Sequence, residues 1–375
     1  RMRPNMYCDF YHIHTQPYSD LSPDLKRRIT KLIQAHYLDH ESFLYDINAR
    51  VLDTYYTGQK HQSFVSFYKR EKLEEHRDTT KPHPFSLKVR FEKNPLACIF
   101  TSQQYIWFTA WKENPYDSNQ SFHFPIYMWD FVCTHRDYKS QMISRKMIQT
   151  HIYNTMKALQ TQVQAGIFKK EVVLCPGVIP LVQYTTYTFF IQRTPISKLP
   201  IGYKIKRIEP RTMNAWVELY TQLPQSTDIF DVVVMPSLNN TIAAIESEAH
   251  YVILLVCTLG GRETVKGVYI FKDTYTVWDQ ETLSQNRTIQ CVSSVCYDFT
   301  QSIIFFRGFV HSIKELYYQK QDYGVLSIEH NSHNGLLLKR WQEKYSMHMT
   351  TPTAYYLYNL IYPKSTLKSE RFFVF

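Results

Sequence analysis

Strand-like and helix-like segments alternate along this chain, and the clearest example lies between residues 122 and 159. Apolar side chains occupy every second position from Phe122 to Met128, which is the period of a strand with one buried face. A helix is expected directly afterwards, from Gln141 to Leu159, because apolar residues recur there on one side of the helix. Alternation of this kind favours an α/β or α+β fold over a helix bundle or a β-sandwich.

The same order of elements occurs twice in the 375 residues. We therefore predict two domains, residues 1–202 and residues 203–375, that repeat one fold. In the first half we also expect a helix from Ser22-Pro23, a charged loop at Lys69–Lys81 and strands at Cys98–Thr101, Tyr105–Trp111, Glu171–Leu174 and Tyr187–Gln192. In the second half we expect helices at Thr212–Leu223, Gln301–Gln321 and Asn334–Lys344, and strands at Asp231–Met235, Tyr251–Thr258, Val265–Phe271, Cys291–Tyr297, Val325–Glu329 and Tyr355–Tyr362.

The charge balance narrows the choice of partner. Lys and Arg number 43 against 33 Asp and Glu, a formal net charge of +10, which suits nucleic acid, a membrane surface or a phosphate-bearing ligand. Glycine is scarce, with 10 residues, which argues against a Gly-rich nucleotide loop. Binding of single-stranded nucleic acid stays open as an alternative, since 29 Tyr and 23 Phe could stack on bases.

Cysteine and histidine usage predicts a cytoplasmic protein without a metal. The seven cysteines include no Cys-x-x-Cys pair, so neither a disulfide scaffold nor a zinc ribbon is expected. Histidine pairs occur without the four-ligand spacing of a zinc site. The longest apolar run, Tyr251–Leu259, is about half the ~20 residues that span a bilayer, so no membrane span is expected.

The junction between the strand at 122–133 and the following helix is a candidate anion site. Strand ends and helix starts both offer backbone N–H groups, and the helix adds the positive end of its dipole. The segment also carries four basic side chains, namely Arg136, Lys139, Arg145 and Lys146. Such a site suits phosphate groups. The alternative is that the basic residues serve only solubility.

This junction resembles the acyl-CoA-binding stretch of eukaryotic-type N-myristoyltransferases, in which an apolar pair, Cys, a small residue and His precede a basic run with Ser. Here these positions are Phe131 to His135, followed by residues 136–146. Further stretches agree with the family in order and approximate spacing, namely Thr15-Gln16-Pro17, Leu32–Phe43, Pro176–Pro180, Tyr355–Asn359 and Phe372–Phe375. The resemblance implies a duplicated acyl-CoA N-acyltransferase (GNAT-like) fold. Its first half would bind acyl-CoA, and its second half would contribute to a peptide groove.

The resemblance also implies an activity, namely transfer of a long-chain acyl group, myristoyl, from acyl-CoA to the N-terminal glycine amine of a protein. The backbone N–H groups of Phe131 and Val132 would form the oxyanion hole. The carboxylate of Phe375 would be the base, and Asp130 and Cys175 would lie beside the reacting atoms. A monomer without bound nucleic acid or metal is expected.

The remaining residues carried over from the family are expected to bind the two substrates. Those assigned to acyl-CoA are Phe10, Tyr11, His12, Val132, Thr134, Lys139, Ser140, Gln141, Met142, Ile143 and Ser144. Those assigned to the peptide are Tyr37, Asp39, Glu41, Gly177, Thr188, Phe190 and Tyr356.

Several positions depart from the family pattern. Cys175 stands where the family has a hydroxyl residue, Asp130 where it has Asn, and Met142 where it usually has Arg. An aromatic–histidine pair of the peptide groove is replaced by a segment with Thr188 and Phe190. Phe190 cannot make the hydrogen bonds of an imidazole. The alternative prediction is therefore a degenerate relative that keeps the fold as a non-catalytic binding or structural protein.

Overall fold

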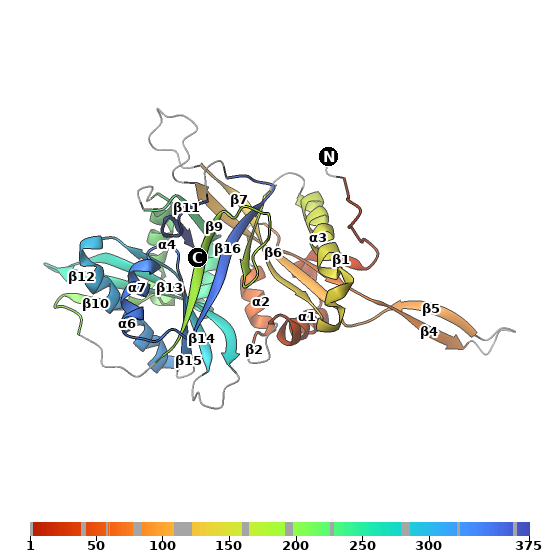
Figure 1. Ribbon diagram of the computed structural model, residues 1–375, viewed down its shortest axis with the longest axis horizontal. Helices are drawn as coiled ribbons and strands as arrows, with labels where there is room; N and C mark the ends of the chain where they lie inside the picture. The colour runs from red at the N-terminus through yellow and green to blue at the C-terminus, as the bar shows by residue number, and fades with distance from the viewer. Residues whose placement is uncertain are drawn as a thin grey trace. The chain divides into compact units, whose positions relative to one another are not determined.

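A computed structural model describes residues 3–38, 43–57, 59, 61–77, 85–108, 122–159, 165–191, 198–225, 229–278, 286–320, 323–362 and 366–375. The chain divides into two compact units (Figure 1). Unit 1 comprises Arg1–Glu41, Ile47–Ser102 and Trp129–Gln164, and unit 2 comprises Ser42–Asp46, Gln103–Met128 and Ala165–Phe375. The predicted domain boundary at residue 202 stays a prediction.

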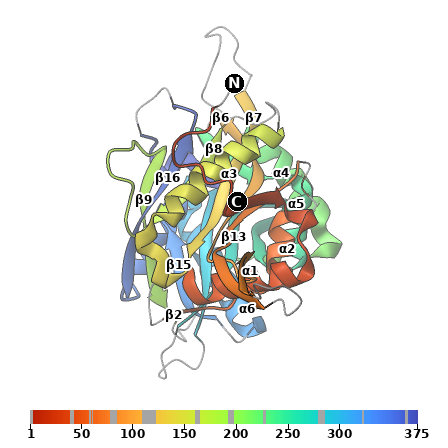
Figure 2. The same cartoon turned by 90° about the vertical axis from the view of Figure 1, so that its right-hand side faces the viewer.

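Unit 1 combines an antiparallel sheet with three helices. Strand β3 (Phe64–Tyr68) pairs on one side with β1 (Ile13–Pro17) and on the other with the first part of β6 (Ala97–Phe108). The last part of β7 (Phe122–Thr134) also belongs to this unit. Figure 2 shows the three helices α1 (Pro23–His36), α2 (Ala49–Tyr56) and α3 (Ile143–Leu159). Helix α3 packs on β1 and β3.

Two sequence predictions for unit 1 are confirmed. Helix α1 begins at Pro23, and the side chain of Ser22 accepts a hydrogen bond from the Leu25 N–H at 3.3 Å, as an N-cap residue does. A strand also leads into a long helix after residue 122. The helix starts two residues later than expected, because a 3-10 turn at Arg136–Gln141 and a left-handed Met142 precede it.

Unit 2 is built on the larger part of the sheet. Its strands follow the order β8 (Gly166–Glu171), β16 (Met349–Tyr358), β9 (Val182–Phe190), β15 (Tyr323–Glu329), β14 (Arg287–Cys296), β13 (Arg262–Trp278), β12 (His250–Leu259) and β10 (Tyr203–Arg207). A short strand β2 (Phe43–Tyr45) pairs with β13, and β11 (Val232–Pro236) pairs with β6 and, in parallel, with β17 (Phe372–Val374). The helices are α4 (Met213–Gln222), α5 (Leu238–Glu246), α6 (Ser302–Lys320) and α7 (Asn334–Gln342).

The core of unit 2 lies on both faces of this sheet. Side chains of α6 and α7, among them Phe305, Phe309 and Trp341, pack against one group of strand residues. Trp216 of α4 and Ile245 of α5 pack against a second group of strand residues, whose side chains point to the other face. Strands β14 and β15 are parallel and are joined by α6. The order strand, long helix, strand also occurs in β7, α3 and β8, which agrees with the predicted α/β class.

Several expected boundaries were wrong. The segment expected as a charged loop contains β4 (Glu71–Arg77), which pairs with β5 (Phe85–Phe91), because ladder hydrogen bonds come from the backbone and tolerate charged side chains. The strands expected at Cys98–Thr101 and Tyr105–Trp111 share the single strand β6, since one part of it pairs with β3 and the next with β11. Residues 109–111 lie outside the described residues. Strand β8 ends at Glu171 instead of beginning there, because Val172 adopts a positive φ of 67°. None of the described helices is long and apolar enough to cross a membrane.

Candidate active site

The end of β7 holds the predicted oxyanion hole in an unusual backbone conformation. Phe131 has a positive φ of 48°, which is uncommon for a bulky side chain. Its N–H donates to the side-chain oxygen Oδ1 of Asp130 at 2.7 Å, and its carbonyl oxygen accepts from the thiol of Cys98 at 3.7 Å. The side chain of the neighbouring Val132 is exposed. The Phe131 N–H is therefore bonded to the carboxylate of the preceding residue.

Tyr37 is brought to the same place from the end of α1. Its hydroxyl donates to Asp130 Oδ1 at 3.5 Å, and its ring lies 5.3 Å from the ring of Phe131. Phe131 itself is buried against Phe100 and Tyr56. Of the residues predicted to bind peptide, Tyr37 thus lies beside Asp130 and Phe131, while Asp39 and Glu41 lie outside the described residues.

The predicted phosphate turn connects β7 to α3. Thr134 is buried, and its hydroxyl lies 2.9 Å from the hydroxyl of Ser144 in the first turn of the helix. Met142 has φ 56° and an exposed side chain, whereas Ile143 is buried. Lys139 and Gln141 are exposed in the 3-10 turn that also contains Ser140.

The basic residues near this turn already have partners. Arg136 donates to the carbonyl oxygen of Leu38 at 2.9 Å, and the Arg145 guanidinium lies 3.6 Å from the centre of the Tyr7 ring. Lys146 contacts Asp9 at 3.3 Å. Phosphate groups that bind here would therefore compete with protein contacts.

The N-terminal segment lies against α3. The Asp9 N–H donates to the hydroxyl of Thr150 at 2.8 Å, and Phe10 meets Tyr153 edge-on at 5.3 Å. Tyr11 and Phe10 are exposed, while His12 contacts the Asp9 carboxylate at 3.0 Å and stacks on another ring. These three predicted cofactor residues thus come from one segment that the structure ties to α3.

In unit 2, two predicted residues meet at β16. The N–H of Cys175 donates to the hydroxyl of Tyr356 at 3.1 Å, and the Tyr356 ring stacks on Phe168 at 5.3 Å. Gly177 follows in the same connection with φ 73°, which only glycine adopts at little cost. The backbone of Cys175 is therefore bonded to the hydroxyl of a buried tyrosine.

Thr188 and Phe190 lie on the opposite face of the sheet from Tyr356. The register pairs Thr188 with Met349 of β16, so these two side chains lie on the same face. Because side chains alternate along a strand, Phe190, two residues from Thr188, shares this face, whereas Tyr356, seven residues from Met349, lies on the other. The Phe190 ring lies 4.3 Å from His348 and 5.7 Å from Trp278. An imidazole thus lies beside Phe190, although it comes from a different segment than the family pattern led us to expect.

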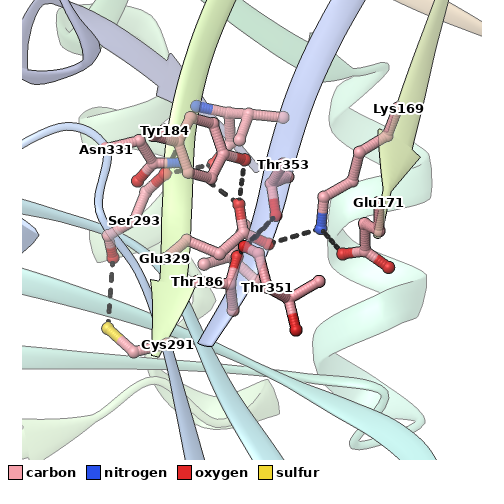
Figure 3. Close-up of polar contacts among 12 residues, drawn as sticks. Lys169, Glu171, Tyr184, Thr186, Cys291, Ser293, Glu329, Asn331, Thr351 and Thr353 are labelled. Atoms are coloured by element: carbon pink, nitrogen blue, oxygen red, sulfur yellow. Dashed lines mark hydrogen bonds and ion pairs between the residues drawn. The ribbon is translucent and has the colours of Figure 1, made fainter. Parts of the chain in front are cut away.

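A buried polar cluster on that same face was not predicted (Figure 3). Glu329, which is 1% exposed, accepts hydrogen bonds from Lys169 at 2.7 Å, from Asn331 at 3.2 Å and from the hydroxyl of Tyr184. Lys169 also contacts Glu171 at 2.7 Å. Although burial opposes the charge, the two carboxylates raise the pKa of Lys169 well above its usual value. The cluster joins β8, β9 and β15.

The last residue of the sequence is held inside unit 2. Strand β17 runs parallel to β11, and the Phe375 N–H donates to the carbonyl oxygen of Val234 at 3.1 Å. The ring of Phe375 stacks on His250 at 4.8 Å and lies 5.1 Å from Trp216. The Phe375 side chain is therefore buried among aromatic rings, while the role of its carboxylate as a base stays a prediction.

Among the described residues, no group of three or more His, Cys, Asp or Glu side chains is arranged to hold a metal ion. All seven cysteines are free thiols.

The mixed sheet with its helix-joined strands places the chain in the α/β fold class. Its particular fold is that of N-myristoyltransferase. The structure of Saccharomyces cerevisiae N-myristoyltransferase with bound myristoyl-CoA matches with a TM-score of 0.65 over 96% of this chain and 85% of that chain, at 9% identity. A structure of the same yeast enzyme with bound myristoyl-CoA and inhibitors matches with a TM-score of 0.64 over 98% and 84%, also at 9% identity. No family model and no curated protein matches the sequence. The predicted N-myristoyltransferase fold is confirmed.

Proposed function

We propose that this protein transfers a long-chain acyl group, myristoyl, from acyl-CoA to the N-terminal glycine amine of a protein. The observation that carries the proposal is the positive φ of Phe131 at the end of β7, because this unusual backbone conformation falls on the residue whose N–H the resemblance assigns to the oxyanion hole. A thioester oxygen placed there would be stabilised as negative charge develops on it during acyl transfer. The shared fold with an enzyme that binds myristoyl-CoA supports the choice of donor.

In the proposed reaction, the deprotonated glycine amine attacks the thioester carbonyl directly. Negative charge moves to the carbonyl oxygen, which faces the N–H groups of Phe131 and Val132. The tetrahedral intermediate then collapses, the carbon–sulfur bond breaks, and CoA leaves as the product thiol. The carboxylate of Phe375 takes the first proton, which converts the glycine ammonium group into the attacking amine. The second proton, which nitrogen loses as the amide forms, goes to the departing CoA thiolate.

Each substrate has a proposed set of contacts. The first turn of α3, with Thr134 and Ser144 at hydrogen-bond distance, would face the CoA phosphates. An acyl chain with about 12 methylenes would gain on the order of 10 kcal/mol from burial at ~0.8 kcal/mol each. The peptide would contact Tyr37, Gly177, Thr188 and Phe190. Tyr356 is not included, because its side chain lies on the opposite face of the sheet from Thr188 and Phe190. The proposal includes a monomeric state and a cytoplasmic location.

A second candidate is an acyl-CoA-binding protein without turnover. The observation that favours it is the Asp130 carboxylate on the Phe131 N–H, since a negative charge at this position opposes an oxyanion. The two candidates differ in one assay. The protein is incubated with myristoyl-CoA and a library of peptides that begin with glycine, and the peptides are analysed by mass. Acylated peptide together with free CoA supports the transferase, whereas acyl-CoA binding without modified peptide supports the second candidate. N-acetylated copies of the same peptides are the control, because they lack the reacting amine.

A further inference from the structure

We propose that Asp130 caps the oxyanion hole. Its carboxylate holds the Phe131 N–H when no acyl-CoA is bound, and it must rotate away before a thioester carbonyl can take its place. This inference rests on the proposed function, because it assigns the Phe131 N–H to the acyl carbonyl. It adds that a negatively charged side chain of the protein competes with that carbonyl for the Phe131 N–H.

The geometry makes Asp130 a strong competitor. The distance of 2.7 Å between the Phe131 nitrogen and Asp130 Oδ1 is short for an N–H to oxygen bond. Hydrogen bonds to a carboxylate are stronger than those to a neutral carbonyl. The neutral oxygen of a thioester therefore has to displace a better acceptor. Because Asp130 directly precedes Phe131 in the chain, its carboxylate is always close to the Phe131 N–H, whereas the thioester must bind from solution.

The surroundings of Asp130 allow it to leave. Its side chain is only half-buried, and the oxygen that accepts from the Phe131 N–H, Oδ1, is also the one that accepts from the Tyr37 hydroxyl at 3.5 Å. This distance is at the outer limit of a hydrogen bond, so a small rotation of the carboxylate toward Tyr37 would shorten it. Phe131, in contrast, is buried and packed against other rings, so its N–H stays where it is. The movable partner of the pair is the carboxylate.

Charge explains why the cap and the reacting carbonyl exclude one another. In the transition state the carbonyl oxygen carries negative charge, and a carboxylate within about 4 Å of it would be repelled strongly at the edge of a protein interior. A neutral side chain of the same shape removes the repulsion and weakens the competing hydrogen bond. Asp130→Asn is therefore expected to bind acyl-CoA more tightly than the natural protein.

The test compares two non-reacting analogues of myristoyl-CoA by titration calorimetry. In the first, a methylene separates sulfur from a ketone carbonyl, so the oxygen that enters the oxyanion hole is kept. The second is an S-alkyl thioether of the same length that has no carbonyl. Asp130→Asn should bind the ketone about tenfold more tightly than the natural protein, or more, as expected for losing a charged competitor, and should bind the thioether equally well.

Asp137→Asn is the matched control. Asp137 lies in the turn after β7, its side chain is 79% exposed, and its removal changes the net charge by the same amount. If the gain of Asp130→Asn came from general attraction of the CoA phosphates, Asp137→Asn would show it too, and for both analogues. Equal thioether binding by the natural protein and Asp130→Asn also shows that the variant is folded.

The outcomes separate the cap from the proposed function. If both analogues bind and Asp130→Asn changes neither affinity, or changes both equally, the cap is disproved and acyl-CoA binding stands. If no variant binds either analogue, the proposed function fails and the cap fails with it. A gain that is confined to the ketone establishes the cap.

Discussion

The hydroxyl of Ser293 forms hydrogen bonds with both the carbonyl oxygen and the N–H of Val374. It donates to the Val374 carbonyl oxygen at 2.6 Å and accepts from the Val374 N–H at 3.3 Å. Ser293 lies in β14 and is fully buried, so one side chain of the sheet sets the position of the last strand. The proposed base, the carboxylate of Phe375, is one residue further along.

Ser293→Ala should therefore lower turnover as well as stability. The loss of two buried hydrogen bonds is expected to reduce the free energy of unfolding by about 2 kcal/mol. Turnover should fall further than stability explains, because the last strand keeps its pairing with β11 but loses both hydrogen bonds that fix Val374 to β14. The control is Ser312→Ala in α6, which loses a single buried bond to the Gly308 carbonyl at 2.9 Å. Equal turnover of the two variants in the presence of saturating substrates would contradict a role for the position of Phe375.

Replacing Glu329 by Gln should destabilise unit 2 strongly. The substitution removes a buried charge that pairs with Lys169 and accepts from Tyr184, and breaking a buried pair from one side costs about 3 kcal/mol or more. Urea unfolding measures the change. The double variant Lys169→Met with Glu329→Gln should be less destabilised than the sum of the two single variants, because it leaves neither member of the buried pair charged, and Glu171, the other partner of Lys169, has a side chain that is 46% exposed. Additive effects would show that the two residues do not interact.

Acid should destabilise unit 1 through His151. This histidine is fully buried, its Nδ1 lies 2.8 Å from the hydroxyl of Ser66, its Nε2 contacts the hydroxyl of Thr101, and burial lowers its pKa from 6.5 to about 3. Between these values the unfolded chain binds a proton that the folded chain does not, so stability falls as the pH decreases from 6.5 toward 3. The loss should reach about 2 kcal/mol near pH 5.

Unfolding in urea at about pH 7 and about pH 5 measures this effect. His151→Gln should reduce the difference between the two conditions by that amount, whereas replacing the exposed His348 should leave it unchanged. Part of the difference will remain, because burial also lowers the pKa of His333 to about 4 and that of His250 well below its usual value. An unchanged difference in His151→Gln would show that the histidine is not the responsible group.

Met142→Arg should strengthen CoA binding. Met142 is exposed in the turn before α3, at the position where the resemblance led us to expect an arginine. A guanidinium there would reach a phosphate of the cofactor and improve affinity by up to about tenfold, and salt would weaken the gain. Met142→Gln is the control of similar size without charge. A gain that is equal for Arg and Gln, or that is independent of salt, would exclude a phosphate contact.

Sequence periodicity predicted the long elements well, and it failed where contacts from elsewhere in the chain decide the structure. The Ser22 cap and the strand-to-helix junction after residue 122 depend on local patterns, and both were predicted. Helix α5 was missed, since its Asn and Thr residues are weak helix formers and its Thr241 is fixed by a bond from the Trp216 indole at 3.0 Å. The β4–β5 hairpin was missed because its charged side chains resemble a loop.

In the candidate site, too, the sequence predicted the local segment but not the contacts between distant residues. The residues of the β7–α3 junction were identified from the sequence, but nothing in it indicated that the Asp130 side chain binds the next N–H in the chain. Lys169 and Glu329 are 160 positions apart, so only the strand pairing brings them together. His348 lies beside Phe190 for the same reason, since the segment before β16 is placed by its register with β9.

The most direct measurement follows the acyl carbonyl itself. Myristoyl-CoA that is isotopically labelled at the thioester carbon is bound to the protein and observed by NMR, and a peptide that begins with glycine is then added. A carbonyl polarised by two backbone donors should give a signal shifted from that of free myristoyl-CoA, and this signal should be replaced by that of a peptide amide. A bound signal identical to that of the free thioester, unchanged after the peptide is added, would contradict the account.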